Sequence, residues 1–245
     1  MTVYALSDLH GCLKFYQAIK EFLQPEDKVY FLGDAGDRGP HPWETIKAIA
    51  KDPQFIYIKG NHEDMLVDAM ADVLREVRGT RAIYLLGSNG GYGTLEEWEA
   101  DGAKEEWMNW INNLPTHEEY VRPDGKKVML SHAGYTPISD GELPWGDDLI
   151  WSRDHFYDPW DEELPDVYVV HGHTPTPLMD KYCYGLEKGA TQKAGALAYC
   201  EGHKFDIDNG AVFTGRCTLF NLDTFESIIF HYSSPNVNCV SYISL

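Results

Sequence analysis

Side chains that can bind metal ions are concentrated in five short motifs between residues 8 and 175. The motifs are Asp8-Leu9-His10-Gly11, Gly33-Asp34-Ala35-Gly36-Asp37-Arg38-Gly39, Gly60-Asn61-His62-Glu63, Ser131-His132-Ala133-Gly134 and His171-Gly172-His173-Thr174-Pro175. A mixture of carboxylate, imidazole and amide oxygen suits Mn²⁺, Fe or Zn²⁺ better than Ca²⁺, which prefers oxygen ligands alone. The candidate ligands outnumber those that one ion needs, which favours a site for two divalent ions.

Arginine adds a second kind of chemistry, because its planar guanidinium is suited to binding two phosphate oxygens at once. Arg38 lies inside the second motif, close to two carboxylates. Arg153, in Trp151-Ser152-Arg153-Asp154, is the second candidate, and Arg122 is an alternative that we expect on the surface. Metal ligands together with arginines would neutralise a phosphate ester and stabilise the charge of its transition state.

The first three motifs each follow a predicted strand. We expect strands at 2–7, 28–32 and 55–58, and helices with apolar residues at helical spacing at 12–23, 40–49 and 65–77. Strands that alternate with helices form a mainly parallel sheet, and functional loops gather at the carboxyl ends of its strands. The three motifs should therefore meet at one edge of this sheet.

The other two motifs follow strands in the second half of the chain. A hairpin of 118–122 and 127–130 leads into His132, and an apolar strand at 167–170 leads into His171. Further strands are predicted at 205–207, 217–222 and 227–232. These segments predict a second sheet packed on the first.

Three stretches between these elements are harder to assign. Residues 79–115 predict a turn-rich segment at 87–93, a helix capped by Thr94 and a second helix around Trp107. Residues 135–165 should be irregular, and 176–204 should form a loop or insertion. If the motifs form a binding site, these stretches are expected to supply its outer walls.

Composition limits the class of protein. With 245 residues, 43% of them apolar, and no repeat or linker, we expect one domain over 1–245. The formal charge of −19 argues against nucleic acid or anionic lipid as a partner. No apolar segment is long enough to span a membrane, and the N-terminus lacks the basic region of a signal peptide. The odd set of cysteines without CxxC spacing indicates reduced thiols in a cytoplasmic protein: Cys12, Cys183, Cys200, Cys217 and Cys239.

In this order, the five motifs resemble the sequence blocks of the phosphoprotein phosphatase family, part of the calcineurin-like metallophosphoesterases. The resemblance runs from residue 3 to about 175, and Asp208-Asn209-Gly210-Ala211-Val212 is similar to a late block of the family. Leu9 and Ala35-Gly36 depart from the usual residues, but no ligand position is lost. Each motif alone is also typical of an ordinary turn, so their joint occurrence carries the resemblance. It implies an α/β fold, a four-layer β-sandwich of two mixed sheets flanked by helices.

The resemblance also implies a role for each site residue. His62 is the implied general acid, and Asp37 orients it. Arg38 and Arg153 bind the substrate phosphate, together with Asn61. The implied ligands of two divalent metal ions, with Asp34 bridging them, are Asp8, His10, Asp34, Asn61, His132 and His173. Histidines outside these roles, including His171 and His155, are expected to be structural.

The implied reaction is phosphate monoester hydrolysis by in-line attack of a hydroxide that two metal ions activate. We expect Mn²⁺, with Fe or Zn²⁺ as alternatives, and no oligomeric state is indicated. A serine/threonine protein phosphatase of the small bacterial or phage kind, acting on a phosphoprotein or small phosphoester, is the first expectation. The alternative is a hydrolase of dinucleoside polyphosphates such as diadenosine tetraphosphate. A remote third is a non-catalytic binding module, which would have lost ligands or His62.

Overall fold

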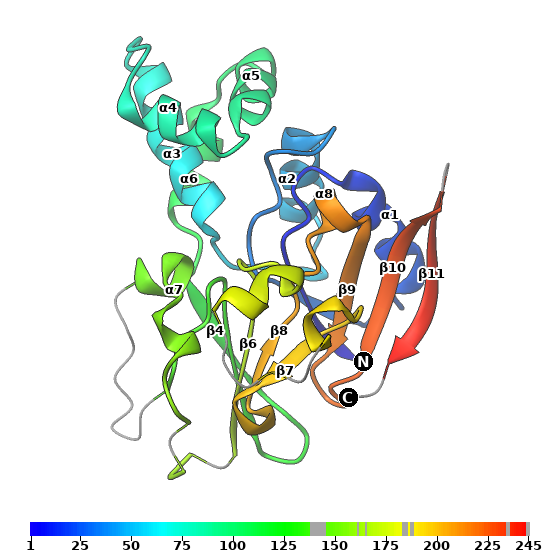
Figure 1. Cartoon of the computed structure of the whole chain (residues 1–245). Helices are drawn as coiled ribbons and strands as arrows, with labels where there is room; N and C mark the ends of the chain where they lie inside the picture. The colour runs from blue at the N-terminus through cyan, green and yellow to red at the C-terminus, as the bar shows by residue number, and fades with distance from the viewer. Residues whose placement is uncertain are drawn as a thin grey trace.

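The computed structural model describes residues 1–137, 146–160, 162–164, 166–182, 186, 189–233 and 236–243, with the backbone alone for 233 and 236–243. Two β-sheets occupy the centre, and the longer helices lie outside one of them (Figure 1). In the described part of the chain, sheet A has the strand order β11-β10-β9-β1-β2-β3 and sheet B has the order β4-β5-β6-β8-β7. The predicted sandwich of two mixed sheets flanked by helices is confirmed.

Each sheet combines parallel and antiparallel strands. Sheet A consists of β1 (Val3–Leu6), β2 (Lys28–Phe31), β3 (Phe55–Tyr57), β9 (Arg216–Asn221), β10 (Ser227–Ser233) and β11 (Asn236–Ile243). Sheet B consists of β4 (His117–Val121), β5 (Lys127–Ser131), β6 (Val167–His171), β7 (Leu197–Tyr199) and β8 (Lys204–Asp206). Strands β1, β2 and β3 run parallel, as do β5, β6 and β8. The loops after these strands therefore leave each sheet at one edge.

The helices are distributed unevenly along the chain. The α-helices are α1 (Leu13–Phe22), α2 (Pro42–Ala50), α3 (Asn61–Leu74), α4 (Arg81–Ser88), α5 (Tyr92–Ala100), α6 (Glu105–Asn112), α7 (Asp148–Trp151) and α8 (Ala211–Thr214). The 3₁₀ helices are η1 (Asp154–Phe156), η2 (Thr176–Lys181), η3 (Ala190–Gln192) and η4 (Cys200–Gly202). None of the helices in the described ranges combines the length and the apolar character that crossing a membrane requires.

Alternating side chains of the strands build separate cores on the two faces of sheet A. Leu6 and Phe31 pack with helices α1, α2 and α3, whereas Ala5 and Leu32 face sheet B and pack with Leu130. This alternation is what a strand buried on both faces requires. The outer face of sheet B has a smaller cluster of Phe156, Met179, Leu197 and Tyr199, supplied partly by η1 and η2. The fourth layer is thus made of short 3₁₀ helices and loops.

Several predicted boundaries were wrong. Helix α3 begins at Asn61, four residues before the predicted start at Met65, because the polar motif forms its first turn. Helix α4 continues through Gly87 and Ser88, where a turn was predicted. Thr94 lies inside α5 and does not cap it. The predicted loop 176–204 contains η2, η3, η4 and β7, and the irregular stretch 135–165 contains α7 and η1.

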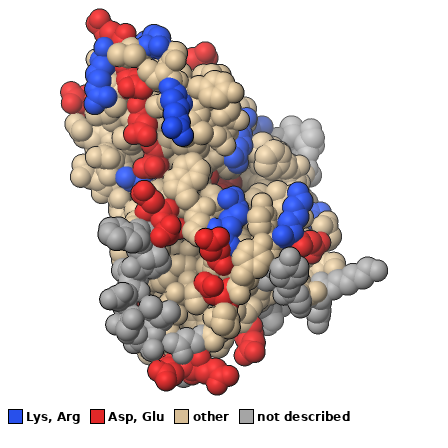
Figure 2. Space-filling view, turned by 60° about the vertical axis from the view of Figure 1, so that its left-hand side comes forward, with Lys and Arg blue, Asp and Glu red and all other residues tan. Residues whose placement is uncertain are grey.

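The charge and thiol predictions can be compared with the described residues. Acidic side chains are spread over the face shown in Figure 2, with Lys and Arg side chains among them. Cys12, Cys200 and Cys217 are free thiols, as predicted. Cys183 and the side chain of Cys239 lie outside the described residues.

Candidate metal centre

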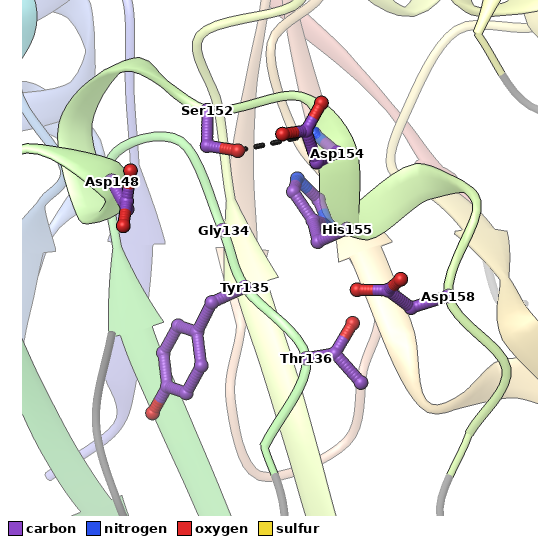
Figure 3. Close-up of a pocket in the computed structure, with 8 residues that line it drawn as sticks. All are labelled: Gly134, Tyr135, Thr136, Asp148, Ser152, Asp154, His155 and Asp158. Carbon is purple, nitrogen blue, oxygen red and sulfur yellow. Dashed lines mark hydrogen bonds between the residues drawn. The ribbon is translucent and has the colours of Figure 1, made fainter. Parts of the chain in front are cut away.

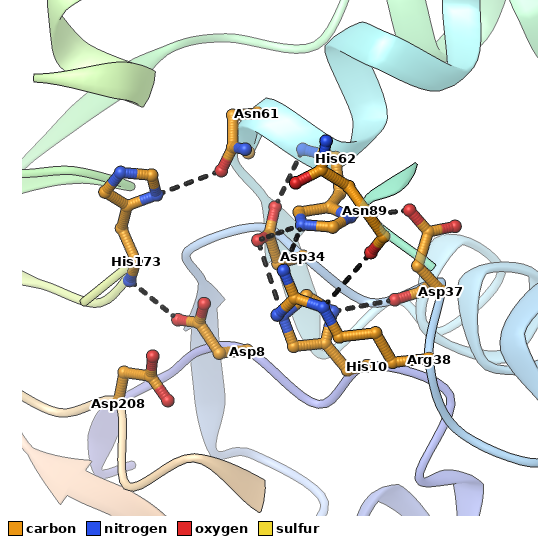
Figure 4. Close-up of polar contacts among 12 residues, drawn as sticks. Asp8, His10, Asp34, Asp37, Arg38, Asn61, His62, Asn89, His173 and Asp208 are labelled. Atoms are coloured by element: carbon orange, nitrogen blue, oxygen red, sulfur yellow. Dashed lines mark hydrogen bonds and ion pairs between the residues drawn. The ribbon is translucent and has the colours of Figure 1, made fainter. Parts of the chain in front are cut away.

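The strand ends of the two sheets meet at one end of the sandwich, where Figure 4 shows the candidate residues gathered together. The backbone N–H of His173, after β6, donates to Asp8 Oδ2, after β1, at 3.0 Å. His132 Nδ1, after β5, donates to the carbonyl oxygen of Leu32, after β2, at 2.6 Å. These two hydrogen bonds join the sheets and place the histidines of sheet B against the acids of sheet A.

The backbone of this region is held in a conformation that side chains rarely adopt. Positive φ angles between 42° and 69° occur at the candidate residues Asp8, His10, Asp34, Asp37, Arg38 and His173. For residues other than glycine, the left-handed conformation costs about 1–2 kcal/mol each. Such strain persists where the surrounding structure enforces it, and it is concentrated at functional sites. Here it directs side chains from different loops towards one position.

One group of candidate ligands brings several lone pairs together. His132 Nδ1 donates to the Leu32 carbonyl oxygen, so an imidazole with one ring proton carries a lone pair on Nε2, which lies 2.9 Å from Asn61 Oδ1. His173 Nδ1 lies 2.9 Å from the same oxygen and 3.2 Å from His132 Nε2. His173 Nε2 is buried with no hydrogen-bond partner among the described residues. Several lone pairs directed at one place, together with the unpartnered His173 Nε2, fit a divalent metal ion.

Asp34 connects this group to a second one. Its Oδ1 lies 3.4 Å from His132 Nε2, and its Oδ2 lies 3.6 Å from His10 Nε2. Ligand-type atoms lie within 4.8 Å of one another in two groups, Asp8–Asp34–His132 and His10–Asp34–His62. Asp34 is the acid that both groups share. The donor set therefore fits two metal ions that would share Asp34, although proximity groups Asp8 with His132, whereas the resemblance to the family groups Asp8 with His10.

Burial makes it costly for the acids of the site to carry a negative charge when no metal ion is bound. Desolvation raises the pKa of Asp34 well above its ordinary value, and the nearby charges of Asp8 and Glu63 add to this effect. Desolvation also raises the pKa of Asp8. Carboxylates that repel one another in a dry site are stabilised as anions by a cation between them.

His62 is fixed by two neighbours. Its Nδ1 donates to Asp37 Oδ2 at 2.5 Å, and its Nε2 accepts a hydrogen bond from Arg38 Nη2 at 2.7 Å. The Thr94 hydroxyl donates to Asp37 Oδ1 and also accepts from the backbone N–H of Asp37. Burial raises the pKa of Asp37 to about 7. Burial, and then the Arg38 charge, lowers the pKa of His62 well below its ordinary value.

The two predicted phosphate-binding arginines lie at the rim of the site. Arg38 is exposed, its Nη1 donates to His10 Nε2 at 2.6 Å, and its Nε donates to the Asn89 carbonyl oxygen at 3.3 Å. Arg153 Nε donates to Thr174 Oγ1 at 2.9 Å, beside His173. Arg122, the alternative, packs on the Phe225 ring at 4.1 Å and pairs with Asp124 instead. The structure therefore brings Arg38 and Arg153 to the site.

Two buried acids of the site were missed by sequence reasoning. Asp208 was named only as part of a block similar to a late block of the family and was given no role, yet Figure 4 places it beside Asp8. Its pKa is raised well above the ordinary value by burial first and by the Asp8 charge second. Glu63 accepts from the backbone N–H groups of Asp34, Ala35 and Gly60 and from the Tyr57 hydroxyl. The position of Asp208, just after a predicted strand, was a signal that could have identified it.

A family model described as calcineurin-like phosphoesterase matches residues 1–208, which include all the candidate ligands. The chain belongs to the calcineurin-like phosphoesterases. The family assignment agrees with the resemblance found in the sequence motifs and with the two-sheet architecture.

Several named phosphoesterases are similar to this chain at 16% to 29% sequence identity. A symmetrical bis(5'-nucleosyl)-tetraphosphatase of Pseudomonas fluorescens is 24% identical over 289 aligned positions, covering 96% of each chain. Serine/threonine-protein phosphatase 2 of Salmonella typhimurium is 29% identical over 160 positions, covering 62% of this chain and 68% of that protein. The solved metallophosphoesterase of Sphaerobacter thermophilus has a TM-score of 0.52 at 16% identity, covering 99% and 88% of the two chains. That likeness confirms the fold.

Behind the ligands of this phosphoesterase lies a pocket of about 230 Å³, shown in Figure 3. It is lined by Gly134, Tyr135, Thr136, Asp148, Ser152, Asp154, His155 and Asp158. His155 Nε2 donates to the Ala133 carbonyl oxygen at 2.8 Å, next to His132. The Tyr199 hydroxyl lies 3.4 Å from His155 Nδ1 and 2.7 Å from His171 Nε2. His155 and His171 thus support the two ligand-bearing loops, in agreement with their expected structural role.

The His155 ring gives stability a pH dependence with a definite sign. Burial lowers its pKa in the folded protein well below the ordinary 6.5, so below pH 6.5 only the unfolded chain takes up this proton. Its contribution to stability is complete above pH 6.5 and is lost as the pH falls towards the folded-state pKa. We expect wild type to lose more stability than His155→Gln between pH 7.5 and 5, by up to about 1.4 kcal/mol per pH unit.

Urea unfolding of the metal-free proteins at several pH values measures this difference. His41→Gln is the matched control, because His41 is exposed and should leave the pH dependence unchanged. Parallel stability–pH curves for wild type and His155→Gln would contradict the assignment.

Proposed function

We propose that this phosphoesterase hydrolyses dinucleoside polyphosphates of the diadenosine tetraphosphate type. The observation that carries the proposal is the match to a bis(5'-nucleosyl)-tetraphosphatase over 96% of both chains, because it includes the substrate walls as well as the ligand motifs. The site chemistry supports a phosphoryl-transfer reaction of this class.

The ligand set supports a pair of divalent ions, which we propose to be Mn²⁺. Asp8 and His10 would hold one ion, Asn61, His132 and His173 the other, and Asp34 both. When bound, such ions polarise the phosphoryl group as Lewis acids and lower the pKa of a coordinated water. The mixture of imidazole and carboxylate ligands is compatible with Mn²⁺.

The remaining groups have defined tasks in this proposal. Arg38 and Arg153 bind the non-bridging oxygens of the phosphoryl group that is attacked. Because Arg38 touches His62 Nε2, a phosphoryl group held by Arg38 lies within reach of this nitrogen. Once Arg38 turns from His62 Nε2 to the substrate, this nitrogen can carry a proton and donate it to the departing phosphate oxygen, and Asp37 on Nδ1 stabilises the charged imidazolium.

A serine/threonine protein phosphatase is the second candidate. The 29% identity to the Salmonella typhimurium enzyme supports it, although that similarity covers 62% of this chain. The sequence motifs alone made this activity the first expectation. The motifs of the metal site are common to enzymes for both substrates, so they do not distinguish the two activities. Because the match to the tetraphosphatase covers more of this chain than the match to the protein phosphatase, we propose dinucleoside polyphosphate hydrolysis first.

A competition between substrates tests the proposal. We expect the Mn²⁺-loaded protein to show a kcat/KM for diadenosine tetraphosphate at least about 100-fold above that for a phosphoserine peptide. Chromatography of the nucleotide products and release of inorganic phosphate from the peptide provide the two rates. Preference for the peptide would overturn the first proposal and support the second.

A further inference from the structure

A second pocket, of about 140 Å³, lies beside the metal centre. It is lined by Thr176, Pro177, Gln192, Lys193, Ala194, Asn209, Thr214 and Arg216. The backbone N–H of Thr176 donates to the Asp208 carbonyl oxygen at 2.7 Å, and Asn209 directly follows Asp208. Thr176 is three residues beyond His173, so their Cα atoms lie within about 11 Å of each other. The pocket is therefore within reach of a substrate that extends from the metals.

The charge of this pocket is opposite to that of the whole protein. Lys193 and Arg216 line it, and none of the described residues that line it is acidic. Neither cation forms an ion pair with an acid in the described part of the chain, although the formal net charge is −19. Two exposed cations that pair with no acid among the described residues, next to polar side chains, suit an anion that arrives from solution.

An exposed aromatic residue, Phe213, directly precedes Thr214, which lines the pocket. Phe213 is 71% exposed, so its ring is open to a ligand from solution. A methyl group built on Gly210 would lie 3.6 Å from the Phe213 ring and 3.6 Å from the Thr214 side chain, so both flank the same glycine. Aromatic rings that remain open to solvent beside a phosphate-binding surface offer a face on which a nucleobase can stack.

We propose that this pocket is a distal subsite for the polyphosphate substrate. Lys193 and Arg216 bind a phosphoryl group that is not the one attacked, and Phe213 stacks on the nucleobase beyond it. A single phosphoryl group, as in phosphoserine, ends at the metal centre and leaves this subsite unused. The inference rests on the proposed dinucleoside polyphosphate hydrolysis and identifies the residues that select such a substrate.

Isothermal titration calorimetry of Mn²⁺-loaded protein tests the subsite without any turnover. ADP reaches both the metals and the subsite, whereas orthophosphate occupies the metals alone. We expect Lys193→Ala/Arg216→Ala to weaken ADP binding at least about tenfold and to leave orthophosphate binding within about twofold. Phe213→Ala should weaken ADP binding several-fold, again without an effect on orthophosphate.

The control variant removes the same charge elsewhere. Lys127 and Arg75 are exposed and lie on β5 and just after α3, so Lys127→Ala/Arg75→Ala should leave ADP binding within about twofold. Equal weakening of ADP and orthophosphate, or unchanged ADP binding in the subsite variants, would overturn the subsite. Failure of the proposed function gives a different result, namely a wild-type protein that binds ADP through this pocket yet does not cleave diadenosine tetraphosphate.

Discussion

Replacing His62 with asparagine should lower kcat for phenyl phosphate by a factor of about 10²–10⁴, the usual cost of losing a general acid. The imidazole is held on Nδ1 by Asp37, and its Nε2 accepts a hydrogen bond from Arg38, the guanidinium that we propose to bind substrate. Asparagine fills part of the space but cannot donate a proton at neutral pH. The phenolate leaving group, with a pKa near 10, depends on that proton.

A change of leaving group separates proton donation from structural damage. The departing group of 4-nitrophenyl phosphate is a much weaker base, so His62→Asn should harm its hydrolysis far less. Steady-state rates of both esters with added Mn²⁺ provide the comparison, and His41→Asn at an exposed position serves as control. An equal fall for both esters would remove the general acid role from His62.

Replacing Asp34 with asparagine should remove both metal ions at once. Each oxygen of Asp34 faces a different ligand group, Oδ1 towards His132 and Oδ2 towards His10. The substitution removes the charge that both sites share, while the retained Oδ1 can still accept from the backbone N–H of His62. We expect the metal content to fall from two ions per chain to below about 0.5, and activity to fall by at least about 10³-fold.

Elemental analysis after dialysis against Mn²⁺-free buffer measures this content. Asp27→Asn is a matched control, because Asp27 is also a buried carboxylate, and it accepts from the backbone N–H groups of Thr2 and Gln24, away from the candidate ligands. It should retain both ions. Two ions in the Asp34→Asn protein would rule out the shared position, and loss of one ion would assign Asp34 to a single site.

The core of the fold was predictable because β1 is buried throughout and β2 and β3 alternate buried with half-buried side chains. Such strands appear in the sequence as short apolar segments, and their alternation with helices indicates parallel pairing. The start of α3 was not predictable, because the first turn contains Asn61, His62 and Glu63 and looks like a polar loop. In this first turn, the backbone N–H of His62 donates to Asp34, 28 residues away in the sequence. The local sequence does not indicate this contact.

The gathering of the candidate metal ligands was predictable for a similar reason, since parallel strands deliver their carboxyl ends to one edge. The outer parts of the site were not. Thr94 has the sequence context of a helix cap, but its hydroxyl instead contacts Asp37, 57 residues away. Lys193 and Arg216 come from separate segments, and only the tertiary structure brings them into one pocket. These contacts depend on how distant segments pack together, which the local sequence pattern does not indicate.

The central claim is that this phosphoesterase holds two divalent ions between its two sheets, with Asp34 shared. Anomalous diffraction from crystals of the Mn²⁺-loaded protein tests it most directly. The claim predicts two manganese peaks, one against Asp8 and His10, the other against Asn61, His132 and His173, with an Asp34 oxygen on each. A single peak, or two peaks of which one lies away from Asp34, would contradict it.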